Sequence, residues 1–431
     1  MSGDTTTAQL PNGLKIRLKE IHTAPIISSW MWYGVGSRNE LPGKTGLSHW
    51  VEHMQFKGTP TYPGGKLDKL ISREGGSWNA LTFLDWTTYF ETLPKNKINL
   101  AFNLEADRMV NSQFDLHEVE SERTVIISER EGSENEPLFK LGEAVQKAAY
   151  KTHPYRNEVI GEKSDLNTLQ RDDLYNHYYS YYTPANALLA VAGDFNSTEL
   201  LEVIQGQFDE LSSHQPPACP VKKEALPGHE TRLSIGGPGE TTYIQIAYRA
   251  PSGNDMDFMP FTVIDSLLTG PTGLNMFGGG SISNKSSRLY QALVDKELAI
   301  VVGGGIQATI DPFLYVITII VNPRHKVETV LAAFDDEVHD LLEQPVSQKE
   351  VDRAIKQARA LFAYGSESIT NQAFWLGYSE MFADYKWFTT YLDRLSTVTP
   401  KDALAVSQKY LVDSARVVGF YIPDIAGKGA K

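Results

Sequence analysis

Two histidines and a glutamate lie within five residues of one another in the stretch GLSHWVEHMQFKGT, which runs from Gly46 to Thr59. They are His49, Glu52 and His53. In an α-helix, residues i, i+3 and i+4 share one face, with about 5 to 6 Å between their Cβ atoms. Two imidazoles at this spacing can bind one zinc ion, and a carboxylate beside them can take a proton from water that the metal activates. The same pattern also suits a half-exposed helix whose histidines make only local hydrogen bonds.

A zinc site of this kind requires a third protein ligand from another part of the chain, because a catalytic zinc usually has three protein ligands and one water. The stretch HEVESERTVIISEREGSENE, from His117 to Glu136, has helical spacing of its apolar residues. It places Glu122 and Glu129 two turns apart on one face. Spacing alone does not choose between these two carboxylates.

The two stretches together resemble the M16, or pitrilysin-type, zinc peptidases, in which an inverted HxxEH motif is followed at a distance by a metal-binding glutamate. Here 75 residues separate His53 from Glu129. The resemblance implies that His49, His53 and Glu129 bind one zinc ion per chain. It also implies that Glu52 is the general base and that Glu122 orients a ligand histidine.

A second resemblance concerns substrate binding. The stretch WNALTFLDWTTYFETL, from Trp78 to Leu93, is similar to the family's strand on the substrate side. Its polar residues among apolar ones also predict paired strands joined by a turn. An open strand edge near the metal could bind an extended peptide by main-chain hydrogen bonds. The resemblance implies that Asn79 and Ala80 contact this peptide.

The chain divides near its middle, where the stretch SSHQPPACPVKKEALPGHE interrupts any periodic pattern and predicts a linker. We expect an N-terminal domain over residues 1–214, a linker over 215–229 and a C-terminal domain over 230–431. The order of elements is similar in the two halves, which indicates two copies of one unit. In the second copy, neither the helix PFTVIDSLLTG nor a later helix over Phe334–Gly365 has a matching triad. We therefore expect metal only in the N-terminal half.

Strands and helices in each half predict an α+β fold of two homologous α/β-sandwich domains, with helices packed on one face of a mixed, mainly antiparallel sheet. The resemblance to M16 peptidases of the mitochondrial-processing-peptidase type (M16B, LuxS/MPP-like) implies the same architecture.

The second half departs from the family pattern at the residues that stabilise the oxyanion. In many active members, an arginine and a tyrosine in a stretch resembling LRxxxxLAY have this role. The corresponding stretch here is LVDKELAIV, in which Val294 and Ile300 fall near those two positions. Both donors are therefore missing, and Arg288 and Tyr290, just upstream, are weaker candidates for the oxyanion role.

These features predict a zinc endopeptidase that hydrolyses extended peptides or unfolded segments. The chain would be the metal-bearing subunit of a heterodimer, and a homologous M16 partner would supply the missing donors. Two alternatives remain open: a structural or peptide-binding subunit without hydrolysis, and a self-sufficient homodimeric peptidase.

The charge, cysteine content and hydropathy of the whole chain restrict the possible functions less than the motifs do. The net charge of −13 argues against nucleic acid as a partner, and the one cysteine, Cys219, excludes an internal disulfide and a thiolate zinc site. The apolar runs are too short to span a membrane, which argues against a membrane partner, and the N-terminus lacks the pattern of a signal peptide. The sequence thus predicts a cytoplasmic location, or a periplasmic or organellar one if a leader has been removed. The glycine-rich segment from Gly270 to Tyr290 predicts a flexible loop at the mouth of a peptide chamber.

Overall fold

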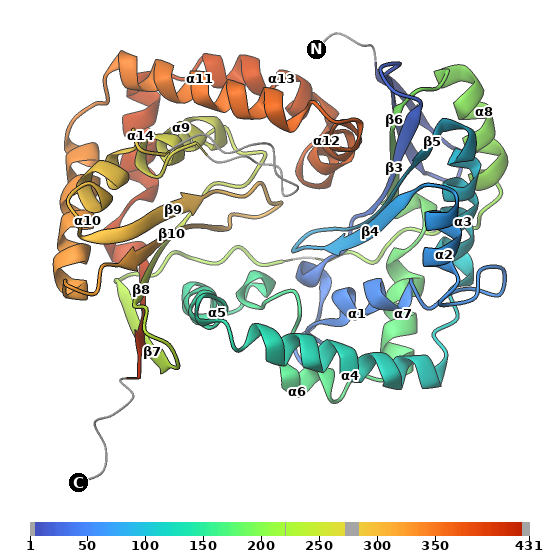
Figure 1. Cartoon of the computed structure of the whole chain (residues 1–431), viewed down its shortest axis with the longest axis horizontal. Coiled ribbons are helices and arrows are strands. Elements are labelled where there is room, and N and C mark those ends of the chain that lie inside the picture. The colour runs from blue at the N-terminus through green and yellow to red at the C-terminus, as the bar shows by residue number, and fades with distance from the viewer. Residues whose placement is uncertain (1–4, 220, 272–283, 425–431) are drawn as a thin grey trace. The chain divides into compact units, whose positions relative to one another are not determined.

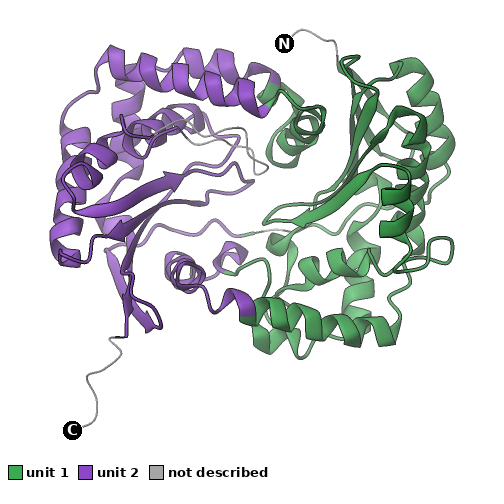
Figure 2. Cartoon of the chain, in the orientation of Figure 1, with its two compact units in different colours: residues 1–131, 157–221, 366–388 green, residues 132–156, 222–365, 389–431 purple. Residues whose placement is uncertain are grey.

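A computed structural model of the chain describes residues 5–219, 221–271 and 284–424 (Figure 1). Most of the loop predicted over residues 270–290 lies outside these ranges. The chain forms two compact units, and each contains one sheet (Figure 2). Unit 1 comprises residues 1–131, 157–221 and 366–388, and unit 2 comprises residues 132–156, 222–365 and 389–431. The domain ranges expected from the sequence stay a prediction.

The sheet of unit 1 has six strands in the order β1-β2-β6-β3-β5-β4. Only β2 and β6 pair in parallel, and the other neighbours are antiparallel. The paired strands predicted within Trp78–Leu93 are confirmed as β4 and β5, and β4 lies at one end of the sheet. The strands are β1 (Thr5–Gln9), β2 (Lys15–Glu20), β3 (Ile26–Tyr33), β4 (Ser77–Thr82), β5 (Thr87–Pro94) and β6 (Ala187–Gly193).

Helices cover both faces of this sheet, because α12 packs on β3 and β6 from the side opposite α3 and α8 (Figure 1). Every residue of β3 after Ile26 is buried, as expected for a strand covered on both faces. The expectation of helices on one face only is therefore wrong for unit 1. Its helices are α1 (Leu47–Met54), α2 (Leu67–Arg73), α3 (Ile98–Asn111), α4 (Leu116–Ser133), α6 (Lys163–Leu166), α7 (Arg171–Tyr181), α8 (Ser197–Phe208) and α12 (Ile369–Phe382).

The sheet of unit 2 has five strands in the order β7-β11-β8-β10-β9, and only β7 and β11 pair in parallel. Helix α5, which precedes the linker in sequence, packs on β11, β8 and β7. The strands are β7 (Thr231–Gly237), β8 (Tyr243–Arg249), β9 (Ala299–Gly305), β10 (Leu314–Val321) and β11 (Val417–Pro423). The helices are α5 (Pro137–Ala149), α9 (Phe258–Leu268), α10 (Val327–Glu343), α11 (Gln348–Gly365) and α14 (Pro400–Tyr410), while α13 (Tyr385–Ser396), like the end of α4, has residues in both units.

In the described ranges, six short helical turns connect these elements. They are η1 (Ser37–Asn39), η2 (Lys95–Lys97), η3 (Pro154–Arg156), η4 (Pro184–Asn186), the π-helical η5 (Tyr290–Val294) and η6 (Asp413–Ala415). Both sheets are mixed and mainly antiparallel and both carry helices, so the predicted α+β fold is confirmed.

The single helix expected over Phe334–Gly365 is wrong, because α10 ends at Glu343 and α11 begins at Gln348. Pro345 follows Gln344, which has the extended backbone angles φ −121° and ψ 132°. A residue before proline is disfavoured in the helical region, and proline itself has no N–H to donate.

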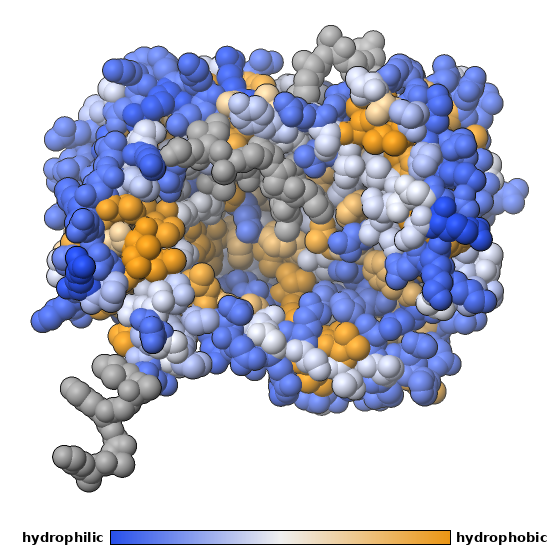
Figure 3. All heavy atoms as spheres, viewed as in Figure 1, coloured by the Kyte–Doolittle hydropathy of each residue, from blue (hydrophilic) through white to orange (hydrophobic). Residues whose placement is uncertain are grey.

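The outer surface is mainly polar in the view of Figure 3, with patches of hydrophobic residues between the hydrophilic ones. Within the described ranges, no helix combines the length and the apolar character that crossing a membrane would require.

Candidate metal centre

Helix α1 presents its two histidines on one face. The helix begins after Gly46, which has a φ of +83°. The carboxylate of Glu40 accepts hydrogen bonds from the backbone N–H of Gly46 (2.9 Å) and of Ser48 (2.7 Å). The first N–H groups of a helix have no partner within the helix, and the carboxyl oxygens of Glu40 satisfy two of these donors. Burial raises the pKa of Glu40 to about 8, although these hydrogen bonds oppose the shift. The rings of His49 and His53 lie one turn apart, with 4.6 Å between their centroids.

Helix α4 brings a carboxylate to these two rings. One ligand atom from each of His49, His53 and Glu129 lies within 4.8 Å of the other two. The Nε2 atoms of His49 and His53 lie 3.9 and 3.7 Å from Oε2 of Glu129. These distances are too long for hydrogen bonds but close to the ~3.4 Å between two ligands of one tetrahedral zinc ion. In the described part of the chain, no other such group of three side chains was found.

The second carboxylate of α4, Glu122, has different contacts. It is buried, its Oε1 lies 2.8 Å from Nδ1 of His53, and its Oε2 forms an ion pair with Lys57. Burial raises the pKa of Glu122, but the hydrogen bonds from His53 and Lys57 outweigh burial and hold it below its usual value. An ionised Glu122 can only accept, so Nδ1 of His53 carries the proton and Nε2 is left as a metal-binding nitrogen.

The two histidines have opposite pKa shifts. Burial lowers the pKa of His49 to about 3, and His53 beside it adds to this. Burial also lowers the pKa of His53, but its hydrogen bond to Glu122 and the nearby carboxylates leave that pKa above the usual value. His49 is thus neutral at pH 7, the form that binds metal. Nδ1 of His49 is buried and has no hydrogen-bond partner among the described residues.

Two imidazoles and one carboxylate are a known ligand set for catalytic zinc. The three side chains therefore fit a zinc ion in their chemistry and in their spacing. His49, His53 and Glu129 are brought together, and Glu122 lies directly beside them through His53.

Glu52 lies on the same helix as the histidines and is 9% exposed. The hydroxyl of Thr82, the last residue of β4, donates a 2.5 Å hydrogen bond to its Oε2. Burial raises the pKa of Glu52, although this hydrogen bond and the nearby His53 oppose the shift. A raised pKa suits a carboxylate that must both take and return a proton near neutral pH.

The residues expected to contact a peptide lie on β4. Asn79 is exposed and Ala80 is buried. The side-chain oxygen of Asn79 accepts a 2.9 Å hydrogen bond from the backbone N–H of Ala80. Among the described strands, none pairs with the outer edge of β4. The substrate contacts of Asn79 and Ala80 stay a prediction.

Arg288 and Tyr290, the weaker candidates for the oxyanion role, belong to unit 2. Arg288 donates to Glu337 of α10 at 3.3 Å and to Glu350 of α11 at 2.9 Å. Tyr290 is the first residue of η5. The guanidinium thus already has two carboxylate partners, and the oxyanion role of both residues stays a prediction.

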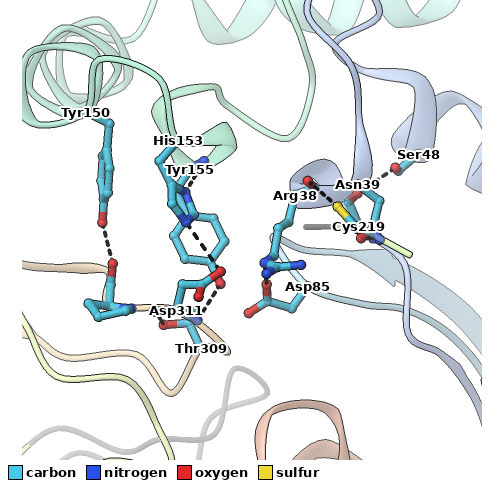
Figure 4. A network of polar contacts seen from close by, with 12 residues as sticks. Arg38, Asn39, Ser48, Asp85, Tyr150, His153, Tyr155, Cys219, Thr309 and Asp311 are labelled. Atoms are coloured by element: carbon cyan, nitrogen blue, oxygen red, sulfur yellow. Dashed lines mark hydrogen bonds and ion pairs between the residues drawn. The ribbon is translucent and has the colours of Figure 1, made fainter. Parts of the chain in front are cut away.

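Two further polar side chains are bound within their own units (Figure 4). In unit 2, Nδ1 of His153 accepts a hydrogen bond from the backbone N–H of Tyr155 at 3.1 Å. Nε2 of His153 lies 3.3 Å from Oδ2 of Asp311. In unit 1, Sγ of Cys219 donates to the carbonyl oxygen of Arg38 at 3.6 Å. These contacts are typical of structural side chains.

Sequence reasoning missed two residues of the site. Glu40 accepts hydrogen bonds at the start of α1, and Thr82 donates one to the carboxylate of Glu52. An acidic residue shortly before a helix is a weak signal for Glu40. No comparable signal marks Thr82, because its contact with Glu52 depends on how β4 packs against α1.

Comparisons with known proteins agree with this fold. The family model described as "Insulinase (Peptidase family M16)" matches residues 15–163. The model described as "Peptidase M16 inactive domain" matches residues 168–358. These are two domains of one class of metalloprotease, so the chain belongs to the M16 peptidase family of zinc proteases.

The relatives carry related descriptions. The zinc protease PqqE of Helicobacter pylori is 28% identical over 96% of this chain and 92% of its own length. The probable mitochondrial-processing peptidase subunit beta of Arabidopsis thaliana is 27% identical over 69% of this chain and 55% of its own length. Among solved structures, a protease from Helicobacter pylori has a TM-score of 0.89 at 26% identity, over 97% of this chain and 99% of that chain.

Proposed function

We propose that this protein is a zinc-dependent endopeptidase that hydrolyses extended peptides or unfolded segments. The observation that supports this most directly is the cluster of His49, His53 and Glu129. One zinc ion per chain would be held by these three side chains. Bound there, zinc would polarise a peptide carbonyl and make water a nucleophile near neutral pH.

Glu52 is the general base in this proposal. Its carboxylate lies one residue from His53 and is held by Thr82, so it would accept a proton from the attacking water. The same carboxyl would then return the proton to the leaving amine. Glu122 would keep Nε2 of His53 directed at the metal by accepting the proton of Nδ1.

Strand β4 would bind the substrate. Its outer edge can pair with an extended chain by main-chain hydrogen bonds, which favours unfolded segments over folded proteins. Thr82 at the end of this strand contacts Glu52, so a peptide paired with β4 would lead towards the general base.

A homologous M16 partner would supply the arginine and tyrosine that stabilise the oxyanion. Val294 and Ile300 stand near the positions of these donors, and neither side chain can donate a hydrogen bond. The relative described as a processing-peptidase subunit beta is by its description one subunit of an assembly. We therefore propose a heterodimer with this chain as the metal-bearing subunit.

The test combines zinc binding and hydrolysis by the purified chain and by its Glu52→Gln variant. The assay uses a quenched fluorescent peptide of about ten residues, which is long enough to span β4 and the metal. Both proteins should bind one zinc per chain. The native chain should cleave the peptide in a chelator-sensitive way, slowly if it acts alone, and the variant should lose at least about 100-fold.

Equal turnover by the two proteins would exclude Glu52 as the general base. Peptide binding by both proteins with no detectable cleavage, even with homologous subunits added, would instead support a binding role without hydrolysis.

A further inference from the structure

A segment that does not contain the three metal-binding residues contacts the start of α1 and also α4, the two helices that carry them. We call residues 160–169, which include α6, the bridging segment. On one side it meets Thr45, which lies just before α1. Oδ2 of Asp165 accepts hydrogen bonds from the N–H (3.0 Å) and the hydroxyl (2.7 Å) of Thr45, and the backbone N–H of Glu162 donates to the same hydroxyl at 2.8 Å.

The backbones of the two segments also touch. A Cβ atom on Gly161, which has a φ of +83°, would lie 2.4 Å from the backbone nitrogen of Gly46. A Cβ atom on Gly46, also at φ +83°, would lie 2.6 Å from the carbonyl oxygen of Ile160. Only glycine at both positions allows this approach without strain. The start of α1 therefore rests directly on the bridging segment.

On the other side, two arginines of α4 bind carbonyl groups of the bridging segment. Nη1 of Arg130 donates to the carbonyl oxygen of Gly161 at 3.2 Å. Arg123 donates to the carbonyl oxygen of Leu169 at 2.8 Å and also to that of Leu166. The guanidinium of Arg123 lies 4.7 Å from the ring centroid of Trp50, which is next to His49 on α1.

We propose that the bridging segment positions α1 relative to α4, and so holds the Nε2 atoms of His49 and His53 at the right distance from Glu129. This inference rests on the proposed zinc site. Thr45 and Arg123 are positioning residues in it, since neither contacts the three ligand side chains. Helix α1 is only eight residues long, so a small rotation at its start would carry both histidines away from Glu129.

Groups that hydrogen-bond directly to metal ligands typically change metal affinity by 10-fold to 100-fold when they are removed, and we expect contacts one step further out to act at the lower end of that range. The test is the zinc dissociation constant of the full chain, measured by competition with a chromophoric chelator. Thr45→Val keeps the shape of the side chain and loses its hydroxyl. Arg123→Lys keeps the charge, but an ammonium group cannot reproduce the two carbonyl bonds together with the ring contact.

Both variants should raise the zinc dissociation constant about 10-fold. The matched control is Lys163→Ala, because Lys163 also joins the bridging segment to α4, through an ion pair with Glu131. Both of those side chains are about half exposed, at 45% and 51%, so this pair contributes little and the dissociation constant should stay within about 2-fold.

A second measurement separates positioning from general stability. A residue that is only structural lowers the melting temperature equally with and without zinc. Loss of positioning reduces the rise in melting temperature that zinc produces, because that rise depends on affinity.

Two results would overturn the inference: native-like zinc affinity in both variants, or an unchanged zinc-induced rise in melting temperature. A native chain that binds no zinc would overturn the proposed function instead.

Discussion

Glu122 and Glu129 lie two turns apart on α4, and their surroundings give them different properties. The side chain of Glu129 is 48% exposed and faces both imidazoles, whereas that of Glu122 is 7% exposed and is bonded to His53 and Lys57. The exposed carboxylate can bind an ion that arrives from solvent. The buried one is placed to orient His53.

Substitution of these two glutamates should therefore weaken zinc binding to different extents. Glu129→Gln removes the proposed ligand and should abolish tight binding. Glu122→Gln keeps an acceptor for Nδ1 of His53 but loses the charge, so the zinc dissociation constant should rise by about 10-fold to 100-fold. Chelator competition measures both values, and a larger effect of Glu122→Gln would reverse the assignment.

Glu224, within the predicted linker, shows how one carboxylate can bind a chain segment. Its carboxylate accepts hydrogen bonds from the backbone N–H groups of Thr152 at 2.9 Å and His153 at 2.8 Å, and from that of Lys151 as well. Burial raises the pKa of Glu224, but these three donors outweigh it and hold the pKa below its ordinary value of 4.5.

Because the pKa of Glu224 is depressed in the folded state, its contribution to stability is fully present above pH 4.5 and is lost as the pH falls through the folded-state pKa. Glu224→Gln should lower the free energy of unfolding by about 1 kcal/mol at pH 7, since the group is partly exposed. Urea unfolding at several pH values should show the difference between the two proteins shrink below pH 4.5. A constant difference would mean that the charge of Glu224 has no role.

At the scale of elements, α12 is bound to the sheet of unit 1 by close contact with β3. The ring of Phe374 lies 5.4 Å from those of both Trp30 and Trp32, measured between centroids. A Cβ atom on Gly377 would lie 2.0 Å from Nε1 of Trp32, so only glycine fits between helix and strand. Arg17 of β2 also donates to Glu380 of α12 at 2.9 Å.

Gly377→Ala should therefore destabilise the protein by about 2 to 3 kcal/mol, because Trp32 is fully buried and cannot move aside without strain. The matched control is Gly206→Ala in α8, where no atom lies within 4 Å of the added Cβ. That change should stabilise the protein by about 0.5 to 1 kcal/mol through helix propensity. Urea unfolding measures both changes, and effects of the same sign would contradict the proposed packing of α12.

At the scale of the whole molecule, the open question is which chain stabilises the oxyanion. Arg288 already bonds to Glu337 and Glu350, and these bonds join the residues just before η5 to α10 and α11. A heterodimer needs no catalytic contribution from this arginine, whereas a self-sufficient homodimer could use it.

Arg288→Ala should therefore lower stability and leave turnover per folded chain unchanged. Loss of an oxyanion donor usually costs about 100-fold to 1,000-fold in turnover, which a peptide assay resolves easily. Tyr290→Phe serves as the second variant, with the same expectation. A loss of that size at unaltered stability would favour the homodimeric peptidase.

The sequence by itself determined the features that depend on local spacing. His49, Glu52 and His53 share a face because the helical repeat places them there, and the alternation within Trp78–Leu93 predicts β4 and β5. Pro345 is also a local signal for the end of α10. The helical pattern on both sides of this proline nevertheless suggested one helix.

Only the tertiary structure decided which groups meet across long separations in the chain. It placed Glu129 against both imidazoles and Glu122 against Nδ1 of His53. Helical spacing alone did not decide which of the two glutamates faces the imidazoles, because both lie on the same face of α4. It also placed α12 on the sheet of unit 1 and α5 on that of unit 2. These contacts follow from the fit of surfaces, such as Gly377 against Trp32, and periodicity carries no information about such a fit.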